Sequence, residues 1–496
     1  MGVVIRQSLK GTFVNYIGVI LGIFVQFYIV TKYIDPAVIG LTKVIYQMAF
    51  LFGTFALLGL PSAGMRFFPY FKNKENGNNG FLFYFLLVPT IGSIVSVLIY
   101  VLSKGFILSS LVEKSPEFEE YFYMVIPLLL ILTFWQVFEN YANINMRIAI
   151  PKAVREVGMR LFMLVIYLLY AFRYIDVYGL VVGFLVGYGL CLLGTGTYSL
   201  CIGSRSLKHD WSFITPELKN KFLKYTGFLI LANISSVLLE FLDTFMVSGL
   251  KGMYSAGIYT IVLYMAEVVN MPSRNITPIS SPLAAEAMKN GDMATSQELY
   301  KKVSVHQCLA TSVLLLIVWI NLDNIYAVIP NGQIYAEGTL AVLFLGFAKV
   351  IYGTLNFGNI LISYSKYYYW TLVCTIILAG LGICTNLYFI PRYGISGAAF
   401  ATLITYTLSY SFQQYLVQVK LKANPFTLAH LRIAVILCVL FGVNYLIPSM
   451  REITPWLDIF VRTLLIAIPA VVMIYYFKIS PQINWFIRTK VLGKAE

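Results

Sequence analysis

Apolar runs about 20 residues long recur along the whole chain. A run of this length crosses the hydrocarbon core of a bilayer as an α-helix, whereas a strand of a membrane barrel needs only about 10 residues of alternating polarity. Charged residues make up 12% of the 496 positions, which is about half the usual share of a soluble domain. The sequence therefore predicts an all-α polytopic membrane protein.

The hydrophobic pattern predicts about fourteen spans in groups of six, six and two. Their expected positions are about 11–31, 38–60, 81–103, 121–142, 157–173 and 178–202, then 225–248, 254–272, 303–321, 336–362, 370–390 and 395–418, and finally 430–448 and 457–477. This predicts an N-terminal six-helix lobe (1–203), a cytoplasmic linker (204–224), a C-terminal six-helix lobe (225–419), and two extra helices with a cytoplasmic tail (420–496).

The net charge of +14 is best explained by membrane topology. If the N-terminus is cytoplasmic, most of the 36 Lys and Arg residues fall on cytoplasmic segments, as positive residues usually do. An even number of spans then places both termini on that side. Nucleic acid is therefore not expected as a partner. The apolar start of the chain is too long for a signal peptide and is read as the first span.

Cysteine and histidine are placed unfavourably for metal chemistry. The six cysteines lie inside apolar runs without a CxxC spacing, and the three histidines are far apart. We therefore expect no metal site, no disulfide framework and no cofactor.

The two six-span groups resemble one another. Gly40, Met48 and Ala49 of the second span match Gly257, Met265 and Ala266 of the eighth, always 217 residues apart. Further matches at offsets of 214–217 are Phe27 with Phe241, Pro61 with Pro278, Asn140 with Asn356, Asn143 with Asn359, and Tyr178-Gly179 with Tyr393-Gly394. Six spans per repeat give both copies the same topology. This predicts two parallel repeats with a substrate site between them.

Several segments resemble the polysaccharide flippases, which share a superfamily with multidrug-and-toxin extrusion transporters and the lipid II flippase. They are IPRYGISGAAFATLITY (390–406), Asp35-Pro36 with Gly40, the run ending at Arg66, and Phe241–Ser248. The expected number of fourteen spans resembles that of the O-antigen and capsule branch of these flippases. The resemblance implies a V-shaped bundle that moves an undecaprenyl-diphosphate-linked oligosaccharide between leaflets of the bacterial inner membrane. Cell-surface polysaccharide such as lipopolysaccharide or capsule would be the product. Membrane lipids, polysaccharide polymerase and glycosyltransferases would be partners.

Charged residues within spans are costly and so mark candidate functional positions. An ionised side chain at mid-membrane costs about 2.5–3.5 kcal/mol on insertion scales. Such residues in this chain are Lys43, Glu139, Arg155, Arg160, Glu240, Asp243, Glu267, Arg274 and Lys349.

Arginine suits a diphosphate because its planar fork grips phosphate oxygens in pairs. The candidates for substrate binding are Arg66, Arg147, Arg155 and Arg274, near the expected cytoplasmic ends of spans. Arg66 and Arg274 follow corresponding spans of the two repeats. The alternative is that these arginines only orient their helices. Replacing Arg66 or Arg274 by Ala is expected to impair export.

Polar side chains near the same span ends could also contact cargo. Asn140, Asn143, Asn356 and Asn359 could bind sugar hydroxyls, or could hydrogen-bond between helices. Glu240, Asp243 and Glu267 could bind a coupling ion, or could form salt bridges with the arginines.

Prolines near span ends are hinge candidates for alternating access. They are Pro61 after the second span and Pro272 and Pro278 after the eighth. Proline removes a helix hydrogen bond and so permits bending.

These features together predict a non-enzymatic transporter, a flippase for lipid-diphosphate-linked oligosaccharide that works by alternating access. One alternative is an ion-coupled exporter of drugs or small molecules with the same fold, for which an acidic cavity would suit a cationic substrate. The other is a membrane glycosyltransferase or polymerase. It is disfavoured because the longest loops contain no DxD-like or His/Asp group that could be catalytic.

Overall fold

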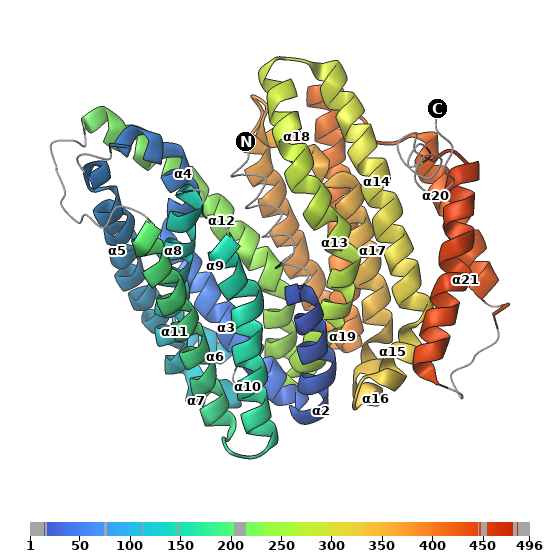
Figure 1. Cartoon of the computed structure of the whole chain (residues 1–496), viewed down its shortest axis with the longest axis horizontal. Helices are drawn as coiled ribbons and strands as arrows, with labels where there is room; N and C mark the ends of the chain where they lie inside the picture. Colours follow the sequence, from blue (N-terminus) through green and yellow to red (C-terminus); the bar gives the residue numbers. More distant parts are fainter. Residues whose placement is uncertain are drawn as a thin grey trace. The chain divides into compact units, whose positions relative to one another are not determined.

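The computed structural model describes residues 17–73, 77–111, 113–145, 147, 149–202, 215–444, 446–447 and 454–479, together with residues 14 and 484. Every regular element in these ranges is a helix (Figure 1). The chain divides into two compact units, residues 1–257 and 258–496, which we call the first and second units.

The first unit is built around α3. Its helices are η1 (Val25–Val30), α2 (Thr31–Tyr33), α3 (Pro36–Leu57), α4 (Leu60–Phe71), η2 (Gly77–Gly80), α5 (Phe81–Leu102), α6 (Lys104–Leu111), α7 (Glu117–Tyr121), η3 (Phe122–Met124), α8 (Val125–Ile144), α9 (Ala149–Ala153), η4 (Val154–Gly158), α10 (Met159–Ala171), α11 (Val177–Ile202) and α12 (Pro216–Lys251). Helix α3 packs against α5, α8 and α12. Val44 and Leu129 are buried in the resulting core.

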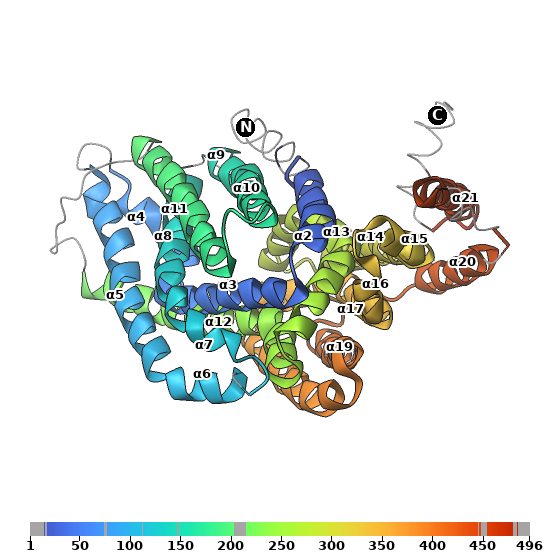
Figure 2. The same cartoon turned by 90° about the horizontal axis from the view of Figure 1, so that it is seen from below.

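The second unit pairs α17 with both α14 and α19. Its helices are α13 (Met253–Lys289), which begins in the first unit, α14 (Met293–Ile320), α15 (Leu322–Val328), α16 (Gly332–Tyr335), η6 (Ala336–Gly338), α17 (Thr339–Leu355), α18 (Phe357–Ser363), α19 (Tyr369–Leu421), α20 (Leu428–Asn444) and α21 (Pro455–Tyr476). Helices α20 and α21 pack on one another, with α20 against α14 and α21 against α15 (Figure 2).

Local sequence explains several helix boundaries. Asp35 caps α3 by accepting a hydrogen bond from the Ala37 amide at 2.8 Å, and Pro36 occupies the first turn. Helix α3 ends where Leu58 and Gly59 take positive φ, at 48° and 72°. Gly394 takes φ 57° and ψ −135°, so α19 consists of two helical arms that meet there.

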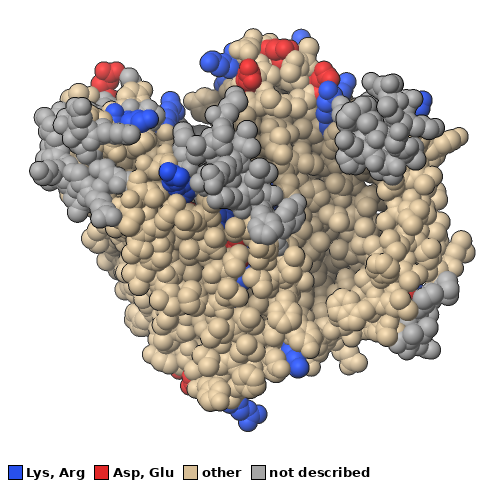
Figure 3. Space-filling view, viewed as in Figure 1, with Lys and Arg blue, Asp and Glu red and all other residues tan. Residues whose placement is uncertain are grey.

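The prediction of an all-α membrane fold with about fourteen spans is confirmed. Within the described residues, nine helices are long and apolar enough to cross a membrane, and Ile17–Tyr33 and Leu428–Asn444 are shorter apolar helices. The two arms of α19 count as separate spans, and α10 and α13 complete the set. Figure 3 shows that most of the visible surface is uncharged.

Two helices extend beyond the predicted spans. The eighth span was expected to end at 272, but α13 continues through Pro272, Pro278 and Pro282 to Lys289. The ninth span was expected to begin at about 303, yet α14 begins at Met293. Both extensions are more polar than the spans, so a pattern of apolar residues does not detect these parts of the helices.

The turn between α13 and α14 is organised by Asp292. Its carboxylate accepts hydrogen bonds from the amide of Thr295 at 2.9 Å and from the hydroxyl of Thr295 at 2.6 Å. These hydrogen bonds hold the pKa of the Asp292 carboxyl below its usual value. Asp292 is therefore the N-cap that starts α14 early.

The predicted linker is only partly described. Residues 204–214 lie outside the described ranges, and residues 216–224 form the first turns of α12. The proposed limits of the two lobes, of the linker and of the C-terminal extension stay predictions.

Candidate functional site

Four polar side chains from two helices meet in the second unit. Glu267, Asn270 and Arg274 belong to α13, and Lys349 belongs to α17. Glu267 Oε2 accepts from Arg274 Nη2 at 2.5 Å and from Asn270 Nδ2 at 3.3 Å. Lys349 Nζ donates to the other carboxylate oxygen, Oε1. We call these four residues the Glu267 cluster.

The position of the Glu267 cluster follows from helix periodicity. Glu267, Asn270 and Arg274 are spaced by three and four residues, which places them on one face of α13. Ala266 and Val269, on another face of the same helix, are fully buried in the packed interior. Packing of that apolar face therefore turns the polar face toward Lys349.

The Glu267 cluster carries one more positive than negative charge, because two cations share one carboxylate. The side chains of Lys349 and Glu267 are 17% and 28% exposed, whereas that of Arg274 is 65% exposed. Arg274 uses Nη2 to reach Glu267, and much of its five-donor guanidinium stays accessible. The cluster can therefore offer a fork of donors and net positive charge to an anion.

Tyrosines lie beside this part of α17. Tyr352 is three residues beyond Lys349, and its ring contacts Tyr410 edge-on at 5.8 Å between centroids. Tyr406 lies 5.5 Å from Tyr410 and 6.4 Å from Tyr352. Both Tyr406 and Tyr410 come from the second arm of α19. The three rings brace α17 against α19 near the Glu267 cluster.

A second polar group lies in the first unit. Arg155 Nη1 contacts Glu139 Oε1 at 2.7 Å, and Arg155 Nε contacts Glu156 Oε1 at 3.3 Å. Arg160 Nη1 pairs with Glu156 Oε2 at 3.0 Å. Two cations balance two acids, so this Glu139 cluster is neutral overall. Arg155 and Glu156 lie on the π-helical turn η4, a distortion that often occurs at functional sites.

The other predicted arginines belong to neither cluster. Arg66 is exposed on α4, and Arg147 is exposed in the connection between α8 and α9. Both belong to the first unit.

The four predicted asparagines have different surroundings. Asn140 donates to the Gln136 carbonyl one turn earlier at 2.7 Å, which is a contact within its own helix. Asn143 is half-buried near the end of α8, and Asn356 joins α17 to α18. The Oδ1 atom of Asn359 is buried and lacks a hydrogen-bond partner among the described residues.

The predicted acidic residues and hinge prolines also lie on different helices. Glu240 is exposed and Asp243 is half-buried on α12, whereas Glu267 forms ion pairs on α13. Pro61 lies in the first turn of α4, directly after the break at Leu58 and Gly59. Pro272 and Pro278 lie inside the continuous α13.

Sequence reasoning noted Lys349 as a charge within a span but did not connect it to Glu267. The two residues are 82 positions apart, and only the packing of α13 against α17 brings them together. Sequence reasoning missed Asp458 and Arg462 entirely. Their i, i+4 spacing in an apolar helix was the available signal.

No group of three or more His, Cys, Asp and Glu residues in the described ranges could hold a metal ion.

Comparison with known proteins identifies the family. The profile of the family described as "Polysaccharide biosynthesis protein" matches residues 8–288, more than half of the chain. The chain belongs to the polysaccharide biosynthesis protein family. None of the curated proteins compared with the chain matches it.

Solved structures show the same fold for this family member. "Lipid II flippase MurJ, inward closed conformation" is similar with a TM-score of 0.68 and 15% identity, over 96% of this chain and all of that one. An inward-facing multidrug resistance MATE family transporter of the MOP superfamily gives a TM-score of 0.59 and 13% identity, over 81% and 94%. A MOP superfamily transporter from Pyrococcus furiosus gives 0.53 and 14%, over 85% and 96%.

Proposed function

We propose that the chain is a flippase that moves a lipid-diphosphate-linked oligosaccharide across the bacterial inner membrane. The polar head group would cross between the leaflets by alternating access while the lipid tail stays in the bilayer. The family supports a role in polysaccharide biosynthesis, and the fold is that of transporters that include a lipid II flippase.

The observation that carries this proposal is the excess positive charge of the Glu267 cluster. Lys349 and Arg274 share one carboxylate, and Arg274 remains largely accessible. A lipid diphosphate carries about two negative charges, and arginine can bind its oxygens in a bidentate manner. Glu267 would hold Arg274 in position until the diphosphate arrives.

A drug exporter is the second candidate, because MATE transporters have the same fold. A cationic drug would need an acidic site. The Glu267 cluster has the opposite sign and the Glu139 cluster is neutral, so both favour the flippase.

Further assignments belong to the same proposal. Both termini would be cytoplasmic, with undecaprenyl diphosphate as the lipid and O-antigen, lipopolysaccharide or capsule as the destination. Polysaccharide polymerase and glycosyltransferases would be partners. Loading of the cargo would be helped by Arg66, Arg147 and Arg155, and its sugars would be contacted by Asn140, Asn143, Asn356 and Asn359. Ion coupling or salt bridges would involve Glu240 and Asp243. The hinges would be Pro61, Pro272 and Pro278.

The first test is binding of an undecaprenyl-diphosphate glycan to purified full-length protein. We expect Arg274→Ala to weaken binding about tenfold, as loss of one charge-assisted hydrogen bond of about 1.5 kcal/mol would do. Arg274→Lys should weaken it less, since the charge is kept and the fork is lost. Binding is measured by equilibrium dialysis with labelled lipid.

The matched control for this test is Arg392→Ala. Arg392 is another exposed arginine of the second unit, stacked over the Tyr388 ring at 3.9 Å. The Arg392→Ala protein should bind the glycan lipid as the wild type does. Equal affinities for the wild type and Arg274→Ala would refute the role of the Glu267 cluster.

A further inference from the structure

A polar cavity lies between the two C-terminal helices and the region that joins α14 to α17. Its volume is about 320 Å³, and it lies wholly in the second unit. Its walls combine charged or amide side chains with aromatic rings. They include Asp323, Asn324, Asn444, Asp458 and Arg462, with Trp319 and Phe441. We call it the C-terminal cavity.

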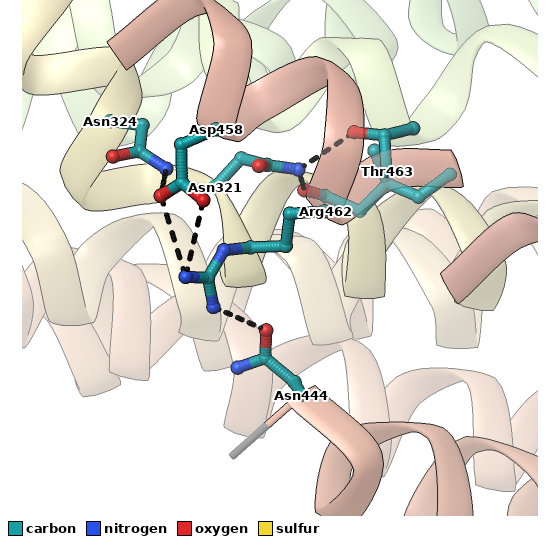
Figure 4. A network of polar contacts seen from close by, with 7 residues as sticks. Asn321, Asn324, Asn444, Asp458, Arg462 and Thr463 are labelled. Atoms are coloured by element: carbon teal, nitrogen blue, oxygen red, sulfur yellow. Dashed lines mark hydrogen bonds and ion pairs between the residues drawn. The ribbon is translucent and has the colours of Figure 1, made fainter. Parts of the chain in front are cut away.

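A hydrogen-bond network forms one wall of the C-terminal cavity (Figure 4). Asn324 Nδ2 donates to Asp458 Oδ2 at 2.7 Å, and Arg462 Nη1 donates to Asn444 Oδ1 at 2.8 Å. These contacts tie α21 to both α15 and α20. Asp458 and Arg462 are only 1% and 8% exposed, although α21 is otherwise strongly apolar.

Arg462 is not fully satisfied by this network. Its Nη2 atom is 3.4 Å from each oxygen of Asp458, which is long for a charge-assisted bond. Its Nε atom is buried without a hydrogen-bond partner among the described residues. Buried polar atoms are nearly always paired, so Arg462 is held in the cavity wall by fewer hydrogen bonds than its guanidinium can make.

The lining determines the chemistry of that ligand. Asp458 neutralises Arg462, and Asp323 is exposed at the cavity, so an anion such as diphosphate would be repelled. Amide, carboxylate and guanidinium groups together offer both donors and acceptors, which hydroxyl groups need. Trp319 and Phe441 offer flat apolar surface suited to the C–H face of a sugar ring.

The size of the cavity agrees with this chemistry. A volume of 320 Å³ lies at the small end of the about 300–1,000 Å³ that ligand pockets span. We propose that the C-terminal cavity is a binding site for one uncharged sugar unit of a glycan. This site is separate from the Glu267 cluster, and the inference does not depend on the proposed diphosphate site.

Binding of methyl glycosides to the purified full-length protein tests this site. The probes are methyl glycosides of neutral hexoses and N-acetylhexosamines, compared with glucuronate and pyrophosphate. We expect at least one neutral glycoside to bind saturably and the two anions not to compete. Competition by pyrophosphate, or absence of saturable binding by every neutral glycoside, would overturn the proposal.

A cavity-filling variant locates the binding. Thr339 lines the cavity, so Thr339→Phe should fill it while leaving Asp458 and Arg462 in place and should weaken glycoside binding at least tenfold. Thr197→Phe makes the same change in an apolar groove of the first unit and should have no effect. Equal loss in both variants, or loss in neither, would contradict the assignment.

A charge-neutral variant separates binding from stability. The double variant Asp458→Asn with Arg462→Gln removes both charges of the ion pair, so no unpaired charge stays buried. We expect the protein to fold and glycoside affinity to fall at least tenfold. Retained affinity would show that the pair serves packing alone.

The sugar could come from the lipid-linked cargo or from a soluble glycan. If Thr339→Phe also weakens binding of the undecaprenyl-diphosphate glycan, the cargo reaches the cavity. If it weakens only the methyl glycoside, a soluble glycan is the ligand. Arg274→Ala should leave glycoside affinity unchanged, so failure here and failure of the proposed flippase are distinguishable.

Discussion

At the scale of single residues, the contact between Gly40 and Gly257 reflects the internal repeat. A Cβ atom on Gly40 would lie 2.1 Å from the Met253 carbonyl oxygen, and one on Gly257 would lie 1.8 Å from that of Pro36. Pro36 and Met253 are themselves 217 positions apart, as the glycines are. The contact is therefore reciprocal, as expected where two copies of one motif meet about a two-fold axis.

We expect Gly40→Ala and Gly257→Ala each to destabilise the protein by about 1–3 kcal/mol, because backbone atoms of α3 and α13 would have to separate. Together they should cost less than the sum, since one separation relieves both clashes. Thermal unfolding in detergent measures the effect. Gly189→Ala, with open space around it, is the control. Strictly additive losses would argue against a shared contact.

Single residues also show which contacts could be predicted from the sequence. The spacing of the repeat alone matched Gly40 with Gly257. The reason that both positions are glycine is the close approach of the two backbones, which only the packing shows. Glu267 and Arg274 were both singled out, and their i, i+7 spacing was readable. Lys349 could not be assigned to them, because no local pattern encodes a contact 82 positions away.

At the scale of elements, α19 depends on one glycine. Gly394 has φ 57° and ψ −135°, a region that residues with a Cβ atom rarely enter. The Tyr-Gly pair at 393–394 matches that at 178–179, but Gly179 lies within α11 and does not have a positive φ. In the first copy the corresponding turn instead uses Arg173 at φ 61°.

Gly394→Ala should therefore destabilise the protein by about 1–3 kcal/mol through backbone strain. Gly380 lies in the same helix with open space around it, so Gly380→Ala should be neutral or slightly stabilising. The fraction of protein that stays folded after heating reports both. A Gly394→Ala protein as stable as Gly380→Ala would mean that the two arms can meet without this conformation.

The two helices that extend beyond their predicted spans share a physical cause. Helix α13 continues through three prolines, and α14 starts ten residues before its apolar part. Proline is tolerated when neighbouring groups satisfy the freed carbonyls, and a polar helix end gains stability from a cap such as Asp292. Hydropathy measures neither effect. The apolar centres of the spans, by contrast, were located because burial in lipid requires them.

At the scale of the whole molecule, each unit carries its own polar group on largely apolar helices. The first unit has the neutral Glu139 cluster, and the second has the basic Glu267 cluster and the C-terminal cavity. Length, composition and periodicity sufficed to predict the fold class. They could not predict the C-terminal cavity, because its walls come from segments more than 100 residues apart.

The most direct test of the flippase is translocation by purified protein in liposomes. The lipid is an undecaprenyl-diphosphate oligosaccharide with a fluorescent sugar, and a membrane-impermeant quencher reports which leaflet holds it. We expect wild-type protein to move the head group faster than protein-free liposomes do, and Arg274→Ala to slow that movement about tenfold. No acceleration by the wild type, combined with ion-driven uptake of a cationic drug, would contradict the account.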